Sequence, residues 1–349
     1  MKKIANKLRK KNRQPKDAQQ SQPPGRITSE NMAEHREEVI GHARKKIYPL
    51  RHSKNRLVSI SISVFLISLV VFVSYCTLAL YRFKQNSEFL YNVTRVIPFP
   101  VARIGSDFVA YENYLFEINR QVYYYETQQE TDFSTESGKK QLEQYKKRAL
   151  EKVINDAYIK QLAEQNSITV SDQEVDNELE ISRGQNRLGG SNTELEDILK
   201  DLWDWSLDDF KRTLKQQLLA QKVASALDRD AHAKANDAYT KLESGMKFGK
   251  LASKVSEDPS TKNSGGEYGF LIEQTNRDIS PKTAAVLFGL KPGQYSKPVD
   301  VGYGLEIIKN LEKNGDRIRA AHIVFNFKDI NEYVNDLKEE RATRTYIKF

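Results

Sequence analysis

The sequence predicts an α+β protein whose folded part follows a single membrane-spanning helix. An apolar run without charged side chains occupies residues 57–81. Through residues 101–230, helix-start signals alternate with apolar residues spaced three and four apart, which predicts an all-helical module. From residue 231 to 326, short helical and strand-like segments alternate, which is typical of a small module built around a sheet.

Positive charge is concentrated at the N-terminus. The 349-residue chain has a formal net charge of +8. Residues 1–56 hold sixteen Lys and Arg against five Asp and Glu, a balance of +11, which leaves −3 for residues 57–349. Nucleic-acid binding needs a basic face on a folded domain, whereas this arm is rich in Gln, Pro and Lys and is expected to lack structure. We therefore expect attraction to anionic lipid and a role in topology, with no nucleic-acid partner.

The apolar run Leu57–Tyr81 is long enough to cross a bilayer. A helix spans the roughly 30 Å hydrocarbon core with about 20 apolar residues and satisfies its backbone hydrogen bonds internally. Its length and its late start argue against a cleaved signal peptide. Basic residues gather before the run and are sparse after it, so the positive-inside rule predicts a cytoplasmic tail at 1–56 and export of residues 82–349. The expected location is the cell membrane, with the lipid bilayer as a partner through Leu57–Tyr81.

The exported part begins with a predicted stalk at residues 82–100. In the helical module, a long helix is expected from about Gly138 to Glu164. Capping-box spacing, in which two side chains satisfy backbone N–H groups at a helix start, marks three further helices. These starts are Ser171 with Glu174, Ser191 with Glu194, and Ser206 with Asp209.

The small module at residues 231–326 is expected to begin with two short helices, one ending at Glu243 and one at Phe248–Val255. Four strand-like segments follow: Tyr268–Ile272, Gln294–Val299, Leu305–Lys309 and Ile318–Phe325. The C-terminal segment 327–349 is predicted to form a helix over Asn331–Tyr346. The sequence leaves open whether this helix covers the small module or crosses to the helical one.

Five short motifs follow one another in order between Gly245 and Lys309. A helix of the type G-x-x-F-x-x-L-A is followed by an S-x-D loop with a G-G-x-x-G turn, an F-x-L-x-x-G turn and two closing strands. The segments are Gly245–Ala252, Ser256–Gly269, Phe288–Gly293, Ser296–Val299 and Gly302–Ile308. In this order they resemble the parvulin family of peptidyl-prolyl cis–trans isomerases. The resemblance implies a four-stranded antiparallel sheet and an enzyme that uses no metal and no cofactor.

In the preceding region, Val101–Leu227, a Val-x-x-x-Gly opening is followed by a long helix ending near Ala163 and then by the run Ile168–Val175. This pattern resembles the N-terminal chaperone region of SurA- and PrsA-type foldases. Together the two resemblances cover nearly all of residues 101–325. They imply a foldase that acts on unfolded, Pro-containing exported chains.

The parvulin resemblance also implies catalytic positions. Asp258 falls on the Cys or Asp position of the loop, and Glu306 replaces the second of two histidines. Each residue also has a structural interpretation, since Asp258 precedes Pro259 and is a common turn residue, and Glu306 could be a structural substitution. The implied substrate-binding positions depart from the family pattern, with Thr283 at a usual Phe; they are Tyr268, Ile279, Thr283 and Phe288.

The first family histidine is missing from its usual strand before the first helix. Arg319–Phe325, which reads RAAHIVF, matches that strand but follows the last one. The Asn314-Gly315 turn signal could join it as a hairpin. We hypothesise a circularly permuted domain in which His322 returns to the active site. The alternatives are a second, degenerate repeat, a fold-back onto the helical module, and a histidine that only fills the core.

Three functions remain open from the sequence. The first is a membrane-anchored, extracytoplasmic peptidyl-prolyl isomerase with a partly substituted active site. The second is a holdase that binds unfolded clients through a parvulin fold without isomerising proline. The third is a structural membrane protein without clients. The retained Asp258 and the His322 strand favour the enzyme, whereas Thr283 and Glu306 favour the holdase. The sequence does not indicate an oligomeric state.

Overall fold

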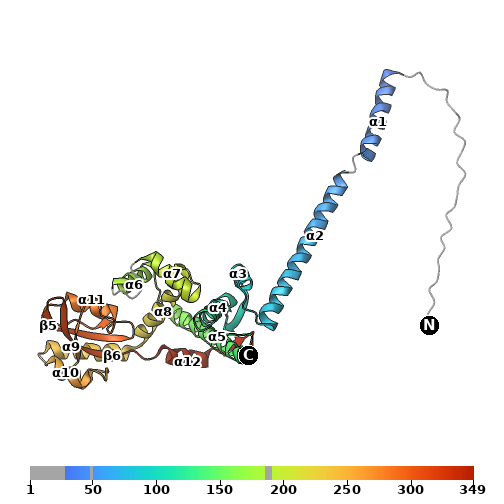
Figure 1. The fold of residues 1–349 in the computed structure, drawn as a ribbon. Coiled ribbons are helices and arrows are strands. Elements are labelled where there is room, and N and C mark those ends of the chain that lie inside the picture. Colours follow the sequence, from blue (N-terminus) through green and yellow to red (C-terminus); the bar gives the residue numbers. More distant parts are fainter. Residues whose placement is uncertain (1–27, 48–49, 185–190) are drawn as a thin grey trace. The chain divides into compact units, whose positions relative to one another are not determined.

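The chain divides into two units, residues 1–74 and 75–349 (Figure 1). The computed structural model describes residues 28–47, 50–184 and 191–349. The first 27 residues of the predicted basic tail lie outside the described residues. The first unit holds α1 (Ser29–Ile47) and most of α2 (Leu50–Thr77). The stretch Asn55–Arg82 is long and apolar enough to cross a membrane, as the sequence predicts.

The second unit begins with the end of α2 and a π-helical turn, η1 (Leu78–Arg82). Its helical module contains α3 (Glu88–Val96), α4 (Tyr111–Gln128), α5 (Glu136–Gln165), α6 (Asp172–Gly184), α7 (Asn192–Trp203) and α8 (Leu207–Leu227). The three predicted helix starts are confirmed. Ser206 and Asp209 form a reciprocal capping box, Ser171 and Glu174 exchange the same bonds, and Ser191 accepts from the Glu194 N–H.

Residues 82–100 do not form the expected stalk. They contain α3, whose Leu90 and Thr94 are buried against the module. The Tyr81 hydroxyl donates to the Pro100 carbonyl over 2.7 Å, and the Tyr111 hydroxyl donates to the Leu80 carbonyl, also over 2.7 Å. The short amphipathic run and the two tyrosines therefore hold this segment in the fold.

A three-stranded sheet corrects the prediction of an all-helical module. β1 (Pro100–Ile104) pairs with β2 (Asp107–Ala110) and with β7 (Thr343–Thr345), in the order β2-β1-β7. The strands are three to five residues long, too short to show the alternation that identifies a strand in sequence. One of the three also comes from the far end of the chain.

The C-terminal segment crosses to the helical module. α12 (Ile330–Glu340) packs on α5 and α8. The expected helix ends at Glu340 because the following residues extend into β7. Directly after β7, the Tyr346 N–H donates to the Val101 carbonyl over 2.9 Å. The Tyr158 hydroxyl contacts Thr343 Oγ1 at 2.7 Å. The helical module is thus completed by residues from both ends of the second unit.

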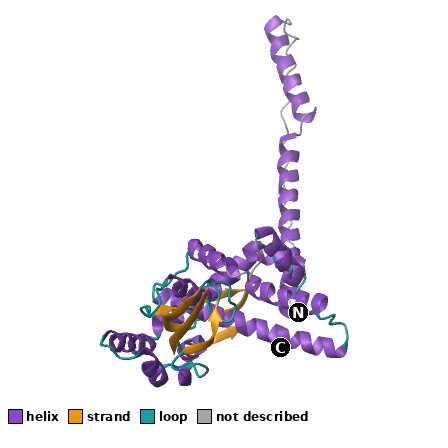
Figure 2. Ribbon diagram, turned by 60° about the vertical axis from the view of Figure 1, so that its left-hand side comes forward, coloured by secondary structure: helices purple, strands orange, loops and turns teal. Residues whose placement is uncertain are grey.

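The remaining elements form a domain inserted between α8 and α12, with helices around an antiparallel sheet (Figure 2). The elements are α9 (Arg229–Glu243), α10 (Phe248–Val255), the 3-10 turn η2 (Lys262–Ser264), β3 (Glu267–Ile272), α11 (Pro281–Gly289), β4 (Val299–Asp300), β5 (Gly304–Asn314) and β6 (Arg317–Asn326). The strand order β3-β6-β5-β4 confirms the predicted four-stranded antiparallel sheet. The strand expected at Gln294–Val299 shortens to β4, since Pro298 has no N–H to donate.

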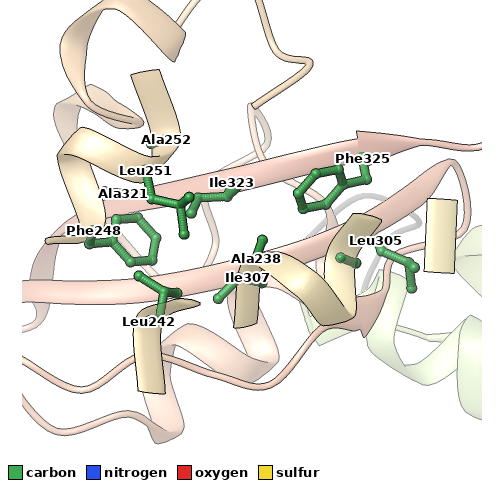
Figure 3. Packing of buried hydrophobic residues seen from close by; sticks show 11 residues of the cluster. Ala238, Leu242, Phe248, Leu251, Ala252, Leu305, Ile307, Ala321, Ile323 and Phe325 are labelled. Carbon is green, nitrogen blue, oxygen red and sulfur yellow. The ribbon is translucent and has the colours of Figure 1, made fainter. Parts of the chain in front are cut away.

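The two faces of this sheet have different neighbours because successive strand residues point to opposite sides. On one face, Ile307 and Ile323 pack with Leu251 in a core that α9 and α10 cover (Figure 3). On the other face, Ile308 and Ala320 pack with residues of α11. By this alternation, Glu306 on β5 and His322 on β6 belong to the second face.

Candidate active site

A cleft of about 810 Å³ lies between the helical module and the inserted domain. One wall comes from α6 and α8 and includes Glu178, Phe210 and Leu214. The opposite wall comes from the inserted domain and includes Asp258 and His322. A peptide in this cleft would touch both modules at once.

His322 is held at the centre of the sheet, on a strand with neighbours on both sides. β6 pairs with β3 and with β5, where His322 lies opposite Ile308. The His322 N–H donates to the Gly266 carbonyl over 2.8 Å. Gly266 has a φ of +85°, and a Cβ there would lie 2.2 Å from the His322 carbonyl oxygen. The glycine is therefore required for the close approach of β3 to β6.

The loop that carries Asp258 is fastened to the same strand. The Ser256 hydroxyl accepts from the Val324 N–H over 3.2 Å, and the Glu257 N–H donates to the Val324 carbonyl over 2.8 Å. The Glu257 carboxylate also accepts from the Asn326 N–H over 2.8 Å. These contacts place Asp258 beside His322, as the permutation hypothesis requires.

His322 lies between two carboxylates. Its Nε2 is 2.9 Å from Asp258 Oδ2, and its Nδ1 is 3.6 Å from Glu306 Oε1. The Tyr268 hydroxyl lies 2.8 Å from Nδ1, and the Thr261 hydroxyl lies 3.0 Å from Nε2. The side chains become more buried along this row, with 19% of Asp258, 7% of His322 and 1% of Glu306 exposed. Asp258 is therefore the member of the three that a substrate reaches most easily.

Two hydroxyl groups satisfy the buried Glu306 carboxylate. The Thr283 hydroxyl donates to Oε2 over 2.7 Å, and the Tyr303 hydroxyl donates to Oε1. A buried charge is strongly unfavourable unless it is paired and hydrogen-bonded. Here the two hydroxyl groups supply the hydrogen bonds, and His322 supplies the opposite charge.

The pKa directions fit a charged histidine between two charged carboxylates. Burial alone would lower the pKa of His322, but Glu306 and Asp258 outweigh it and raise the pKa above its usual 6.5. Burial alone would raise the pKa of Glu306, but His322, Tyr303 and Thr283 lower it. The pKa of Asp258 is also lowered, because hydrogen bonds from Thr261, Ser260 and His322 outweigh its partial burial. The cluster therefore favours the imidazolium form of His322 and the charged forms of both carboxylates.

The residues predicted to bind substrate fall into two groups. Tyr268 and Ile279 line the cleft, and the Tyr268 ring centroid lies 4.2 Å from that of His322. Thr283 is fully buried and donates a hydrogen bond to Glu306, while Phe288, near the end of α11, packs against the core of the second sheet face. Neither Thr283 nor Phe288 is among the described residues that line the cleft.

Three site residues were missed from the sequence. Thr261 and Ser260 donate hydroxyl hydrogen bonds to the Asp258 carboxylate, over 2.5 and 2.7 Å to the nearest oxygens. Tyr303 holds Glu306 and lines the cleft. Tyr303 lies within the Gly302–Ile308 motif, which was the signal for it in the sequence. The hydroxyls of Ser260 and Thr261 gave no signal beyond their closeness to Asp258.

The described residues contain no cluster of three or more His, Cys, Asp and Glu side chains arranged to hold a metal ion. The site offers two carboxylates, an imidazole and several hydroxyl groups. None of these is arranged as an activated nucleophile, since the hydroxyl groups and His322 stabilise the charged carboxylates. The arrangement suits non-covalent binding and polarisation of an amide.

Two family models match the chain. The model of the PPIC-type PPIase domain matches residues 218–312, and that of the SurA-like N-terminal domain matches residues 49–224, about half of the chain. The first match ends before β6, the strand that carries His322.

Similar proteins are named either as parvulin-like PPIases or as foldases. A parvulin-like PPIase of Rickettsia bellii is 30% identical over 202 residues, which are 53% of this chain and 67% of the relative. A parvulin-like PPIase of Rickettsia typhi is 29% identical over 201 residues, which are 53% of this chain and 68% of the relative. The foldase protein PrsA of Caldanaerobacter subterraneus is 29% identical over 184 residues, 50% of this chain and 59% of the relative. The chain therefore belongs to the parvulin-type peptidyl-prolyl cis–trans isomerases that carry a SurA-like N-terminal domain.

Proposed function

We propose that this isomerase is a membrane-anchored foldase that acts outside the cytoplasm on unfolded, Pro-containing chains. The observation that carries the proposal is the Asp258–His322–Glu306 row, which ends at a cleft shared by both modules. A cleft with walls from a helical module and from the isomerase domain suits an extended client better than a small isolated ligand.

Asp258 is the proposed catalytic residue because it can touch the substrate. Rotation about a peptide bond meets a barrier of roughly 18–20 kcal/mol. An isomerase lowers this barrier by binding the twisted amide more tightly than either planar form. As the amide twists, resonance is lost and the charge distribution around the carbonyl changes. A fixed carboxylate in a partly desolvated cleft can stabilise the changed charge distribution without reorganising.

His322 and Glu306 are proposed to act through Asp258 as positioning residues. The imidazolium fixes Asp258 Oδ2 at 2.9 Å, and Glu306 supports the positive charge of the ring from its other side. Glu306 itself is almost completely buried. A carboxylate in the place of the family's second histidine would thus keep His322 charged over a wider range of pH.

The apolar helix would serve as the anchor. Its length suits a bilayer, and the basic residues before it favour a cytoplasmic N-terminus. Anchoring would hold the cleft near the membrane from which exported chains emerge unfolded. A tether raises the local concentration of a binding site without adding a contact.

A holdase without isomerase activity is the second candidate, and one observation favours it. Thr283, at the family's usual Phe position, is turned to Glu306 rather than to the cleft. The flat ring that a Phe would offer to a proline is therefore absent at this position, although Tyr268 and Ile279 line the cleft.

A protease-coupled proline isomerisation assay on the full chain in lipid nanodiscs tests the proposal. We expect a rate above that of buffer, with Asp258→Ala and His322→Ala close to the buffer rate. If the wild-type chain matched buffer and still suppressed aggregation of an unfolded client, the holdase would stand instead. The full chain is needed because Cys76 at the end of α2 and Leu80 in η1 are buried in the fold.

A further inference from the structure

The apolar helix enters the folded unit without a spacer. Residues 57–74 precede the second unit and extend over roughly 27 Å at about 1.5 Å per residue. This nearly matches the roughly 30 Å hydrocarbon core of a bilayer. The next residues, Cys76, Ala79 and Leu80, are at most 2% exposed. The folded unit therefore begins about where the hydrocarbon would end.

Residues from several elements contact the end of this helix and the segment after it. Besides the Tyr111 and Tyr81 hydroxyl bonds, the Lys146 ammonium donates to the Lys84 carbonyl over 2.8 Å. The Lys84 ammonium lies 4.6 Å from the centre of the Phe349 ring. These contacts hold the segment that follows the apolar helix within the second unit.

α3 lies directly after this connection and is amphipathic. Its Leu90 and Thr94 face the module. At 100° per residue, Phe89 and Val96 lie within about 20° of each other, on the side next to Leu90. Phe89 is 53% exposed and Val96 is 83% exposed, and Phe83 before the helix is 66% exposed. Three large apolar side chains are thus at least half exposed within twenty residues of the anchor.

We propose that this surface, formed by Phe83, Phe89 and Val96, rests in the headgroup–acyl boundary of the bilayer. It rests on the proposed membrane anchoring and adds a second contact to it. Amphipathic helices in that position bury their apolar face about 5–10 Å into the boundary region. The bilayer is the occupant because the chain itself brings this surface close to it. Seven residues lie between Tyr81 and Phe89, and the backbone there is held where Lys146 binds the Lys84 carbonyl and where the Gln85 N–H binds the Ala79 carbonyl.

Site-directed fluorescence on the full chain in phospholipid vesicles tests the proposal. Cys76 is the single cysteine, so a Cys76→Ala background accepts one label at a time. Phe89→Cys and Val96→Cys place a polarity-sensitive nitrobenzoxadiazole dye on the surface. Met246→Cys, an exposed apolar position in the inserted domain, is the matched control. Retained proline isomerase activity shows that each labelled chain is folded, and the unsubstituted Cys76 chain gives the labelling background.

We expect blue-shifted emission at positions 89 and 96 and loss of that emission with lipids brominated near the carbonyl end of the acyl chain. The label at position 246 should show neither effect. Emission at 89 and 96 equal to that at 246, in a chain that resists carbonate extraction, would overturn the proposal and leave the anchor intact. Release of the chain by carbonate would show that the apolar helix does not anchor it in the bilayer. A blue shift that bromine does not quench and that fades on dilution with lipid would assign the surface to a second copy, against the proposal.

Discussion

His322 Nε2 lies 2.9 Å from Asp258 Oδ2, although 64 residues separate the two in the chain. The strand that carries His322 follows every other strand of its sheet, yet it occupies a central position between β3 and β5. The site is therefore assembled only when the last strand of the domain has inserted. Activity and the stability of the inserted domain should respond to the same contacts.

Asp258→Asn should lower kcat/KM for proline isomerisation by about 10- to 100-fold. A hydrogen bond to a charged group contributes roughly 1.5–3 kcal/mol, and about 1.4 kcal/mol corresponds to tenfold in rate. Asp278→Asn is the matched control, since Asp278 lines the same cleft and has no contact with His322 among the described interactions. Equal losses for the two variants, measured in the protease-coupled assay, would remove Asp258 from the mechanism.

Glu306→Gln should destabilise the inserted domain most at mildly acidic pH. The raised pKa of His322 gives stabilisation that is complete below about 6.5 and is lost as pH rises through the folded value. The lowered pKa of Glu306 gives stabilisation that is complete above about 4.5 and is lost as pH falls. The free energy difference between wild type and variant, from urea unfolding, should therefore be largest between these values and shrink toward alkaline pH. Glu273→Gln, a surface partner of Arg317, should show no such profile.

Gly266→Ala should unfold the inserted domain or destabilise it far more than Gly269→Ala. Both glycines have a positive φ, +85° and +78°, so both variants carry the backbone cost of roughly 1–2 kcal/mol. Only at Gly266 would the added Cβ meet another group, the His322 carbonyl oxygen at 2.2 Å. Thermal unfolding compares the two. Similar melting temperatures would show that β3 can move away from β6 at little cost.

Ile347→Ala should lower the stability of the helical module by about 2–5 kcal/mol, the usual range for truncating a buried isoleucine. Ile347 is 1% exposed and follows β7. Lys348→Ala, at the exposed neighbouring position, should stay within about 0.5 kcal/mol of wild type. Hydrogen exchange of α5 and β1 locates the effect. Faster exchange confined to β5 and β6 would contradict the assignment of the C-terminal segment to the helical module.

Local signals predicted the parts of the fold that depend on local interactions. The spacing of Ser206 and Asp209 predicted a helix start. The Asn314-Gly315 turn signal predicted the hairpin that brings His322 into the sheet. The pairing of β1 with β7 left no such signal, because a three-residue strand has no visible period and its partner is far away in sequence. The same holds for the site. Asp258 stood in a motif, whereas the use of Thr283 as a donor to Glu306 depends on the packing of α11 against β5.

The pairing of β1 with β7 also sets an order of events during synthesis. The Lys84 ammonium binds the Lys348 carbonyl, and this contact cannot form until a residue 264 positions later in the chain has been made. A ribosome makes the helical module first and its closing strand last, so a partly synthesised chain has α4 and α5 but lacks β7 and Ile347. Until β7 has been made, each new molecule is itself an incompletely folded chain.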